Sequence, residues 1–73
     1  MSTNRTPPDF DEFLAEVKNV KSRHHHWRLG QAAFNTLYWM RPDLSERIRG
    51  TVLDPFYDDS LPASFCDWLK ENW

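Results

Sequence analysis

Hydrophobic positions recur at three- and four-residue steps in the first part of the chain, after a short polar start. Asp9, followed three residues later by Glu12, forms a capping-box pattern that is typical of a helix start. The spacing predicts a first helix that runs from this cap to about Lys21, and residues 1–8, which include two adjacent prolines, are expected to be a flexible N-terminus. The apolar face of the helix is Phe10, Phe13, Leu14, Val17 and Val20.

A second helical pattern covers residues 28–40, and its apolar residues form two adjoining stripes, which predicts contact with two neighbours. The stripes are Leu29, Ala33, Leu37 and Met40, then Trp27, Phe34 and Tyr38. Gly30 weakens a helix by about 1 kcal/mol, so we expect it to mark a helix start or a close backbone approach. Trp39 falls on the polar side with Arg28 and Asn35, where burial is not expected.

Proline and glycine delimit a short third helix. Pro42 suits a first helical turn and disfavours helical geometry at Arg41, so the backbone is expected to break there. The third helix then covers residues 42–49, and Gly50 is its expected cap.

The segment after Gly50 is expected to be a loop, with room for a short extended segment around residues 51–53. Asp54 is expected to accept hydrogen bonds from turn N–H groups, and Phe56 or Tyr57 to close the core. Ser60 is the expected cap of a fourth helix with a buried stripe of Leu61, Phe65, Trp68 and Leu69.

These patterns predict an all-α fold, a small single domain of about four short helices over residues 9–73. The expected core is Phe10, Phe13, Leu14, Val17, Leu29, Phe34, Leu37, Leu44, Ile48, Phe56, Phe65 and Leu69.

The composition of the chain excludes several classes of function. The lone Cys66 cannot form an internal disulfide, no apolar run approaches the ~20 residues of a membrane span, and the start of the chain lacks a signal peptide, so we expect a cytoplasmic protein. Two glycines cannot build a glycine-rich phosphate loop. Because no catalytic motif is recognisable and the chain offers little concave volume, we expect no enzyme activity and no cofactor.

The most unusual stretch is "KSRHHHWRLGQ", residues 21–31, where three histidines lie among cationic side chains. Consecutive residues of a helix or a strand point in different directions, so His24, His25 and His26 cannot converge on one metal ion from regular structure. We favour a solvated helix end at which one histidine caps carbonyl groups. A metal-responsive histidine patch is the weaker reading.

The same stretch could bind nucleic acid, because cations around Trp27 can neutralise phosphates while the ring stacks on bases. The two predicted helices joined through Arg41 and Pro42 could also form a helix-turn-helix, in which Arg47 and Arg49 would contact the bases of DNA. The net charge of -2 argues against this reading, since nucleic-acid-binding domains are usually basic. A small DNA-binding repressor stays the alternative function.

Protein recognition is the favoured reading of the surface. The chain has four tryptophans and two tyrosines, more than so small a core needs, and Trp, Tyr and Arg often dominate interface energy. Trp27, Arg28 and Trp39 are therefore candidates for a binding face, and Lys21 and Arg23 could steer an acidic partner.

Residues 27–57, "WRLGQAAFNTLYWMRPDLSERIRGTVLDPFY", resemble a family of short bacterial and phage proteins. The shared pattern is Arg28, Gly30, Gln31, Phe34 and Asn35, then Arg41 to Leu44, then Asp54 to Tyr57. With its length, the chain is also similar to small RNA polymerase-binding transcription regulators of lytic Xanthomonas phages. That resemblance implies a protein that binds host RNA polymerase, inhibits initiation by displacing sigma factor and acts as an antiterminator.

The implied partners are the beta-prime N-terminal segment and the beta flap of bacterial RNA polymerase, with no small-molecule substrate, no membrane and only a secondary role for nucleic acid. Since charge and aromatic character coincide at residues 21–28, we expect the contact there, together with neighbouring rings. The predicted partner-binding residues are Phe10, Lys21, Arg23, His25, Trp27, Arg28 and Trp39.

Overall fold

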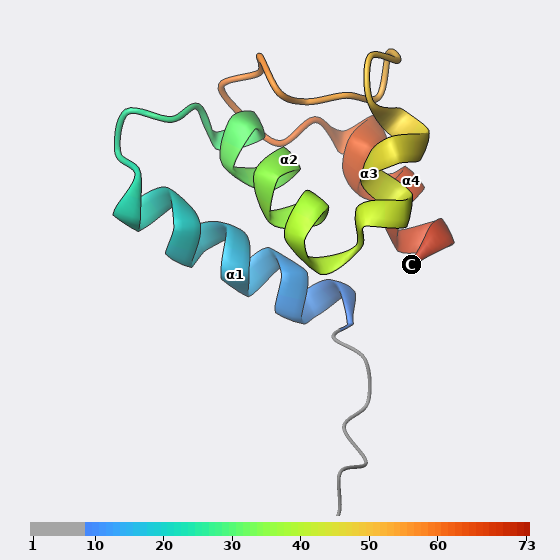
Figure 1. Cartoon of the computed structure of the whole chain (residues 1–73), viewed down its shortest axis with the longest axis horizontal. Helices are drawn as coiled ribbons and strands as arrows, with labels where there is room; N and C mark the ends of the chain where they lie inside the picture. Colours follow the sequence, from blue (N-terminus) through green and yellow to red (C-terminus); the bar gives the residue numbers. More distant parts are fainter. Residues whose placement is uncertain (1–8) are drawn as a thin grey trace, which may run out of the picture.

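The computed structural model describes residues 9–73, and within them four helices follow one another without a strand (Figure 1). They are α1 (Phe10–Arg23), α2 (Leu29–Met40), α3 (Pro42–Ile48) and α4 (Ala63–Asn72). The predicted all-α fold is confirmed. The expected flexible N-terminus, residues 1–8, lies outside the described residues.

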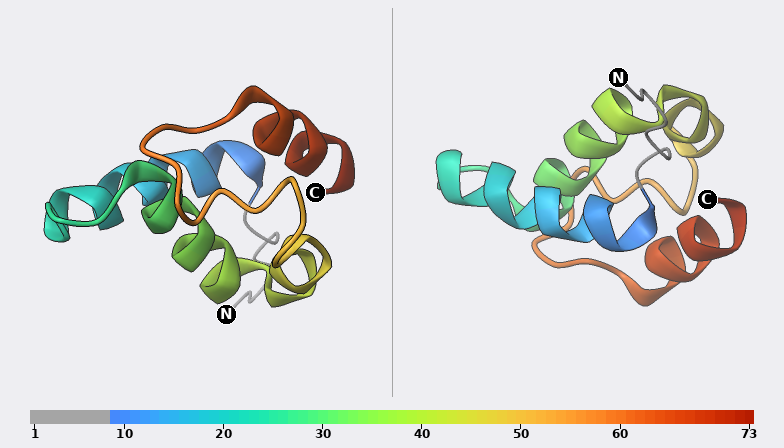
Figure 2. Two further views of the ribbon diagram at one scale, coloured as in Figure 1. Left: turned by 90° about the horizontal axis from the view of Figure 1, so that it is seen from above. Right: turned by 90° about the horizontal axis from the view of Figure 1, so that it is seen from below.

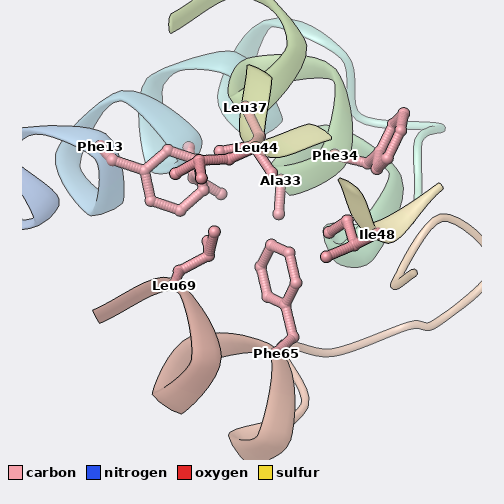
Figure 3. Close-up of a cluster of buried hydrophobic side chains, with 9 residues drawn as sticks. Phe13, Ala33, Phe34, Leu37, Leu44, Ile48, Phe65 and Leu69 are labelled. Carbon is pink, nitrogen blue, oxygen red and sulfur yellow. The ribbon is translucent and has the colours of Figure 1, made fainter. Parts of the chain in front are cut away.

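Helix α2 is the central element. It contacts α1 on one side and α3 on the other, which is what its two apolar stripes predicted. Helices α1 and α2 run in opposite directions and are joined by a loop at one end of the molecule (Figures 1 and 2). Helix α4 covers the remaining side of the core, where Phe65 and Leu69 point toward Leu37 and Ile48 (Figure 3).

The predicted capping box at the start of α1 is confirmed. The Asp9 carboxylate accepts a hydrogen bond from the Glu12 N–H at 2.8 Å, and the Glu12 carboxylate accepts one from the Asp9 N–H at 3.0 Å. Each pair satisfies a donor that the helix itself cannot. Helix α1 ends at Arg23, two residues beyond the expected end at Lys21.

The loop after α3 is organised by Asp54, as predicted. Its carboxylate accepts hydrogen bonds from the N–H groups of Gly50, at 2.8 Å, and Phe56, at 3.0 Å. Gly50 has a φ of 73° and follows the last helical cap, which is the left-handed position expected for it. Residues 51–53 form turns, so the short extended segment that we allowed there is absent.

Helix α4 begins at Ala63, and the predicted cap at Ser60 is wrong. Pro62 is extended, with a ψ of 141°, and it also disfavours helical geometry at Leu61. The first turn therefore starts after the proline, where the Pro62 carbonyl accepts a hydrogen bond from the Cys66 N–H at 3.1 Å.

The core lies between α2 and the other three helices (Figure 3). Its buried members are Phe13, Val17, Ala33, Phe34, Leu37, Leu44, Ile48, Phe65 and Leu69. Four residues expected inside, Phe10, Leu14, Leu29 and Phe56, are only partly buried at its edge. Tyr38 is 47% exposed, so the second apolar stripe of α2 ends before it.

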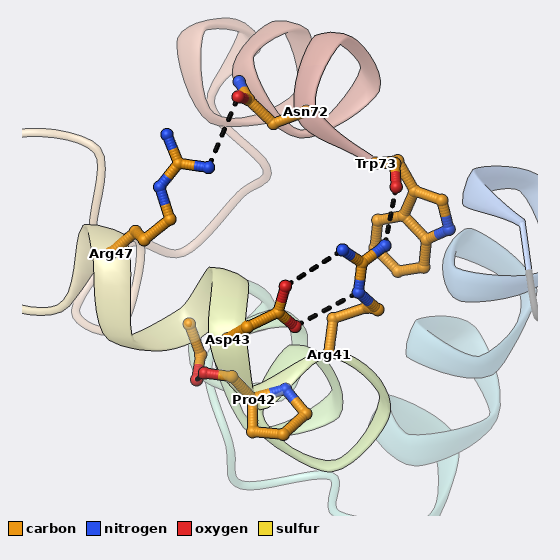
Figure 4. A network of polar contacts seen from close by, with 7 residues as sticks. Arg41, Pro42, Asp43, Arg47, Asn72 and Trp73 are labelled. Carbon is orange, nitrogen blue, oxygen red and sulfur yellow. Dashed lines mark hydrogen bonds and ion pairs between the residues drawn. The ribbon is translucent and has the colours of Figure 1, made fainter.

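Arg41, the one residue between α2 and α3, ties the start of α3 to the C-terminal residue Trp73 (Figure 4). Its guanidinium donates to both carboxylate oxygens of Asp43, at 3.1 and 3.0 Å, and to the Trp73 main-chain oxygen at 2.6 Å. It also lies over the Trp73 ring. Nearby, Arg47 donates to Asn72 at 3.5 Å and covers the Trp68 ring, so α3 and α4 are tied twice.

Gly30 marks both features that its position predicted, a helix start and a close backbone approach. Its N–H donates to the Asp58 carbonyl at 2.9 Å. A Cβ at this position would lie 2.7 Å from the same oxygen and would overlap the Pro55 carbonyl oxygen. The loop backbone therefore packs directly on the first turn of α2.

We predict that Gly30→Ala destabilises the domain by about 3 kcal/mol, because neither carbonyl can move without moving the loop backbone. Gly50→Ala is the matched control, with open space around its Cβ and a cost of about 1 kcal/mol from its positive φ alone. Urea unfolding of both variants measures the difference. Equal stability of the two would show that the loop adapts to a methyl group.

The Arg41–Asp43 pair predicts a pH dependence. The hydrogen bonds from Arg41 lower the pKa of Asp43 below its ordinary value of 3.8. A carboxylate with a lowered pKa stabilises the folded state above its ordinary pKa, and this contribution disappears as the pH falls through the folded-state pKa. Asp43→Asn should therefore be less stable than the natural protein at neutral pH.

The two proteins should converge in stability as the pH falls below 3.8. Thermal unfolding at a series of pH values tests this. A stability difference that is the same at neutral pH and in acid would show that the charge of Asp43 contributes nothing.

Candidate protein-docking surface

The cationic stretch, residues 21–28, covers the last turn of α1 and the loop that joins α1 to α2, at the end of the molecule farthest from α3 (Figures 1 and 2). We call residues 21–28 the basic loop. Its turn is closed by backbone hydrogen bonds, in which the His24 N–H donates to the Val20 and Lys21 carbonyls and the Trp27 N–H donates to the His24 carbonyl. The Lys21 ammonium donates to the His25 carbonyl at 3.2 Å, so the side chain folds over the turn.

His24 caps the end of α1, as predicted for one of the histidines, but it donates to the helix carbonyls through its backbone N–H and not through its ring. The His24 ring instead stacks on Trp27, with 3.8 Å between ring centroids and an 8° angle between planes. His25 and His26 are exposed. Across residues 9–73, no cluster of three His, Cys, Asp or Glu side chains has the geometry to hold a metal ion.

The cations of the basic loop have acidic neighbours. Arg23 pairs with Glu16 at 3.5 Å, and Arg28 pairs with Asp59 at 3.3 Å. Both pairs are well exposed to solvent, so each contributes about 0 to 1 kcal/mol and can exchange for another partner. Sequence reasoning could have found Glu16, which lies two helical turns before Arg23, but no local signal pointed to Asp59.

Trp39 is the second surface feature, at the other end of α2. Its side chain is 57% exposed, as its polar helical neighbours predicted. It borders a groove of about 450 Å³ between α1 and α2, which we call the α1–α2 groove. The lining residues are Glu12, Ala15, Glu16 and Asn19 from α1 and Thr36, Trp39 and Met40 from α2.

This groove was missed in the sequence. The signal was present in part, because Glu12, Glu16 and Asn19 lie on one side of α1 by helical periodicity. The sequence pattern does not predict which side of α2 faces these residues, because this depends on how the two helices pack.

The predicted site residues therefore fall into three places. Lys21, Arg23, His25, Trp27 and Arg28 share the basic loop, and Trp39 borders the groove. Phe10 belongs to neither, because it is half-buried at the start of α1, with its ring against Phe13 and Trp73 at centroid distances of 5.9 and 6.1 Å.

No protein-family model, no curated protein and no solved structure matches the chain. Among the helices of residues 9–73, none combines the length and the apolar character needed to cross a bilayer.

We predict that Trp39→Ala changes the free energy of unfolding by less than about 1 kcal/mol, because most of the ring faces water. Phe65→Ala, at a fully buried position of the same core, should cost about 3 to 5 kcal/mol. Thermal and urea unfolding provide the comparison. Strong destabilisation by Trp39→Ala would mean that this ring supports the fold and is not held available for a partner.

Proposed function

We propose that this protein is a non-enzymatic transcription regulator that docks on host bacterial RNA polymerase and inhibits initiation by displacing sigma factor. The observation that carries docking is the exposure of Arg23 and Arg28 in the basic loop, beside the half-buried Trp27, and of Trp39, since Arg and Trp are residue types that dominate protein interfaces. Polymerase is chosen as the partner because the sequence, together with its length, resembles small RNA polymerase-binding regulators of lytic phages.

The chemistry of the side chains supports docking over catalysis. Burial, with a further contribution from Asp67, raises the pKa of the Cys66 thiol, so the thiolate needed for nucleophilic attack is disfavoured. Asp43 is held by Arg41 in a structural ion pair. Neither group lines the α1–α2 groove.

Cations of the basic loop would steer the protein toward an acidic surface of the polymerase, and Trp27 would supply apolar contact area once docked. The proposed partners are the beta-prime N-terminal segment and the beta flap. A regulator that stays bound after initiation could also promote readthrough at terminators. This activity would place the protein in the bacterial cytoplasm.

Two observations favour docking over the alternative of a helix-turn-helix repressor. Only Arg41 separates α2 from α3, whereas a helix-turn-helix uses a turn of about three to four residues. The cations of this region are also engaged within the domain, since Arg47 covers Trp68 and Arg49 pairs with Glu46 at 3.1 Å. A mobility shift with duplex DNA in the absence of polymerase separates the two functions.

We predict that Arg23→Glu combined with Arg28→Glu weakens binding to core RNA polymerase by about tenfold or more, because a rim charge reversal opposes an acidic partner. The fold should survive, since both arginines make only exposed ion pairs. Arg49→Glu with Lys70→Glu makes the same change of charge on exposed residues at the end of α3 and in α4, and is the matched control, since Arg49, like Arg23 and Arg28, takes part in an exposed ion pair.

Binding of each variant to core enzyme and to sigma-containing holoenzyme, followed by promoter-dependent transcription, provides the measurement. Equal binding of the two double variants would remove the basic loop from the interface. If the natural protein bound neither form of polymerase, the proposed function would be wrong.

A further inference from the structure

We propose that the α1–α2 groove binds a short cationic segment of a partner protein, one that also carries a large aliphatic side chain. The groove is distinct from the basic loop, which has the opposite charge. Its occupant follows from the charges and the apolar surface that line it.

The electrostatic argument rests on the α1 wall. Glu12 and Glu16 are one helical turn apart on the same side of α1, and both line the groove. Asp11 is exposed in the same first turn. The seven lining residues include no lysine or arginine, so the groove attracts a cation and repels an acidic segment.

Both carboxylates can take a partner without unfolding the helix. Glu12 uses one oxygen, Oε1, for the capping box, and its other oxygen is not needed there. The Glu16 carboxylate accepts a long hydrogen bond from the Asn19 side-chain amide at 3.4 Å and pairs with Arg23 at 3.5 Å. Both contacts are exposed, so an incoming lysine or arginine can replace the Arg23 pair at little cost.

The α2 wall adds apolar area. Trp39 is exposed over more than half of its surface, and Met40 and Ala15 lie beside it in the lining. Methionine adapts to differently shaped side chains, and tryptophan is a frequent interface anchor. The Thr36 hydroxyl donates to the Ala32 carbonyl at 2.7 Å, so it makes no demand for a polar group from the occupant.

The helix also gives the occupant a direction. Along one side of α1, acidic Glu12 and Glu16 are followed by neutral Asn19 and then by cationic Arg23. A bound segment should therefore place its cations at the Glu12 end and any acidic residue toward Arg23. A volume of about 450 Å³ is in the range of small ligand sites, enough for one or two side chains and not for a whole helix.

This inference rests on the proposal that the protein acts by docking, but not on the identity of the partner. The test uses peptides and no polymerase, so a failure of groove binding and a failure of polymerase binding give separate results.

The experiment titrates the ¹⁵N-labelled protein with a synthetic peptide of about ten leucine and lysine residues and follows the NMR spectrum. Two matched peptides carry glutamate in place of every lysine, or serine in place of every leucine. We expect the lysine–leucine peptide to shift the Trp39 indole N–H and the Glu16 amide, and the other two to bind at least about tenfold more weakly.

Glu12→Gln with Glu16→Gln should weaken the lysine–leucine peptide by about tenfold. Glutamine at position 12 keeps the capping box, so the fold is retained. Asp67→Asn with Glu71→Gln removes the same charge from exposed residues of α4 and should leave affinity unchanged.

Three outcomes would overturn the inference. The first is tight binding of the glutamate peptide, and the second is equal affinity in the two double variants. The third is a concentration-dependent shift of the Trp39 indole without peptide, which would assign the groove to a second copy of this chain.

Discussion

The structure depends on one backbone contact, between the first turn of α2 and the loop at residues 55–58. The Gly30 N–H donates to the Asp58 carbonyl, and the space where a Cβ would lie is filled by loop carbonyls. This close approach buries Pro55 and sets Phe56 edge-on against Phe34 at a centroid distance of 6.0 Å. The long connection from α3 is thereby fixed, and α4 can follow it back across the core.

Because most of α2 is buried, a binding surface on this helix can lie only at its ends. From Gly30 to Leu37 the helix is buried or half-buried throughout, and within α2 only Tyr38 and Trp39 are well exposed. Arg49 lies near the Tyr38 ring, so Trp39 is the larger apolar surface left open. A partner of the central helix can therefore reach it only at its ends, through the basic loop before it or through Trp39 near its last turn.

Local signals predicted much of this fold. The capping box at Asp9 and the turn at Asp54 depend on residues within four positions of one another, and both are as expected. One error was local, the cap at Ser60, because Pro62 delays the start of α4. The others arose where distant packing decides. Tyr38 has the spacing of a core residue but no element covers it, and the Arg28–Asp59 pair joins residues far apart in the sequence. The α1–α2 groove belongs to the same class, since it exists only once two helices have packed.

Segregation of charge along α1 gives a protein with a net charge of only -2 two oppositely charged ends on one helix. Its 14 residues span about 20 Å, and the acidic first turn and the basic last turn lie at opposite ends. At physiological salt, exposed charges are screened over about 8 Å, so Glu12 in the first turn and Arg23 in the last turn act separately, while Glu16 between them pairs with Arg23 at 3.5 Å. A partner that met only one end would leave the other exposed to solvent. Engagement of both therefore requires two oppositely charged elements, either on one extended surface or on two subunits held side by side, and this requirement favours a large assembly over a small free ligand.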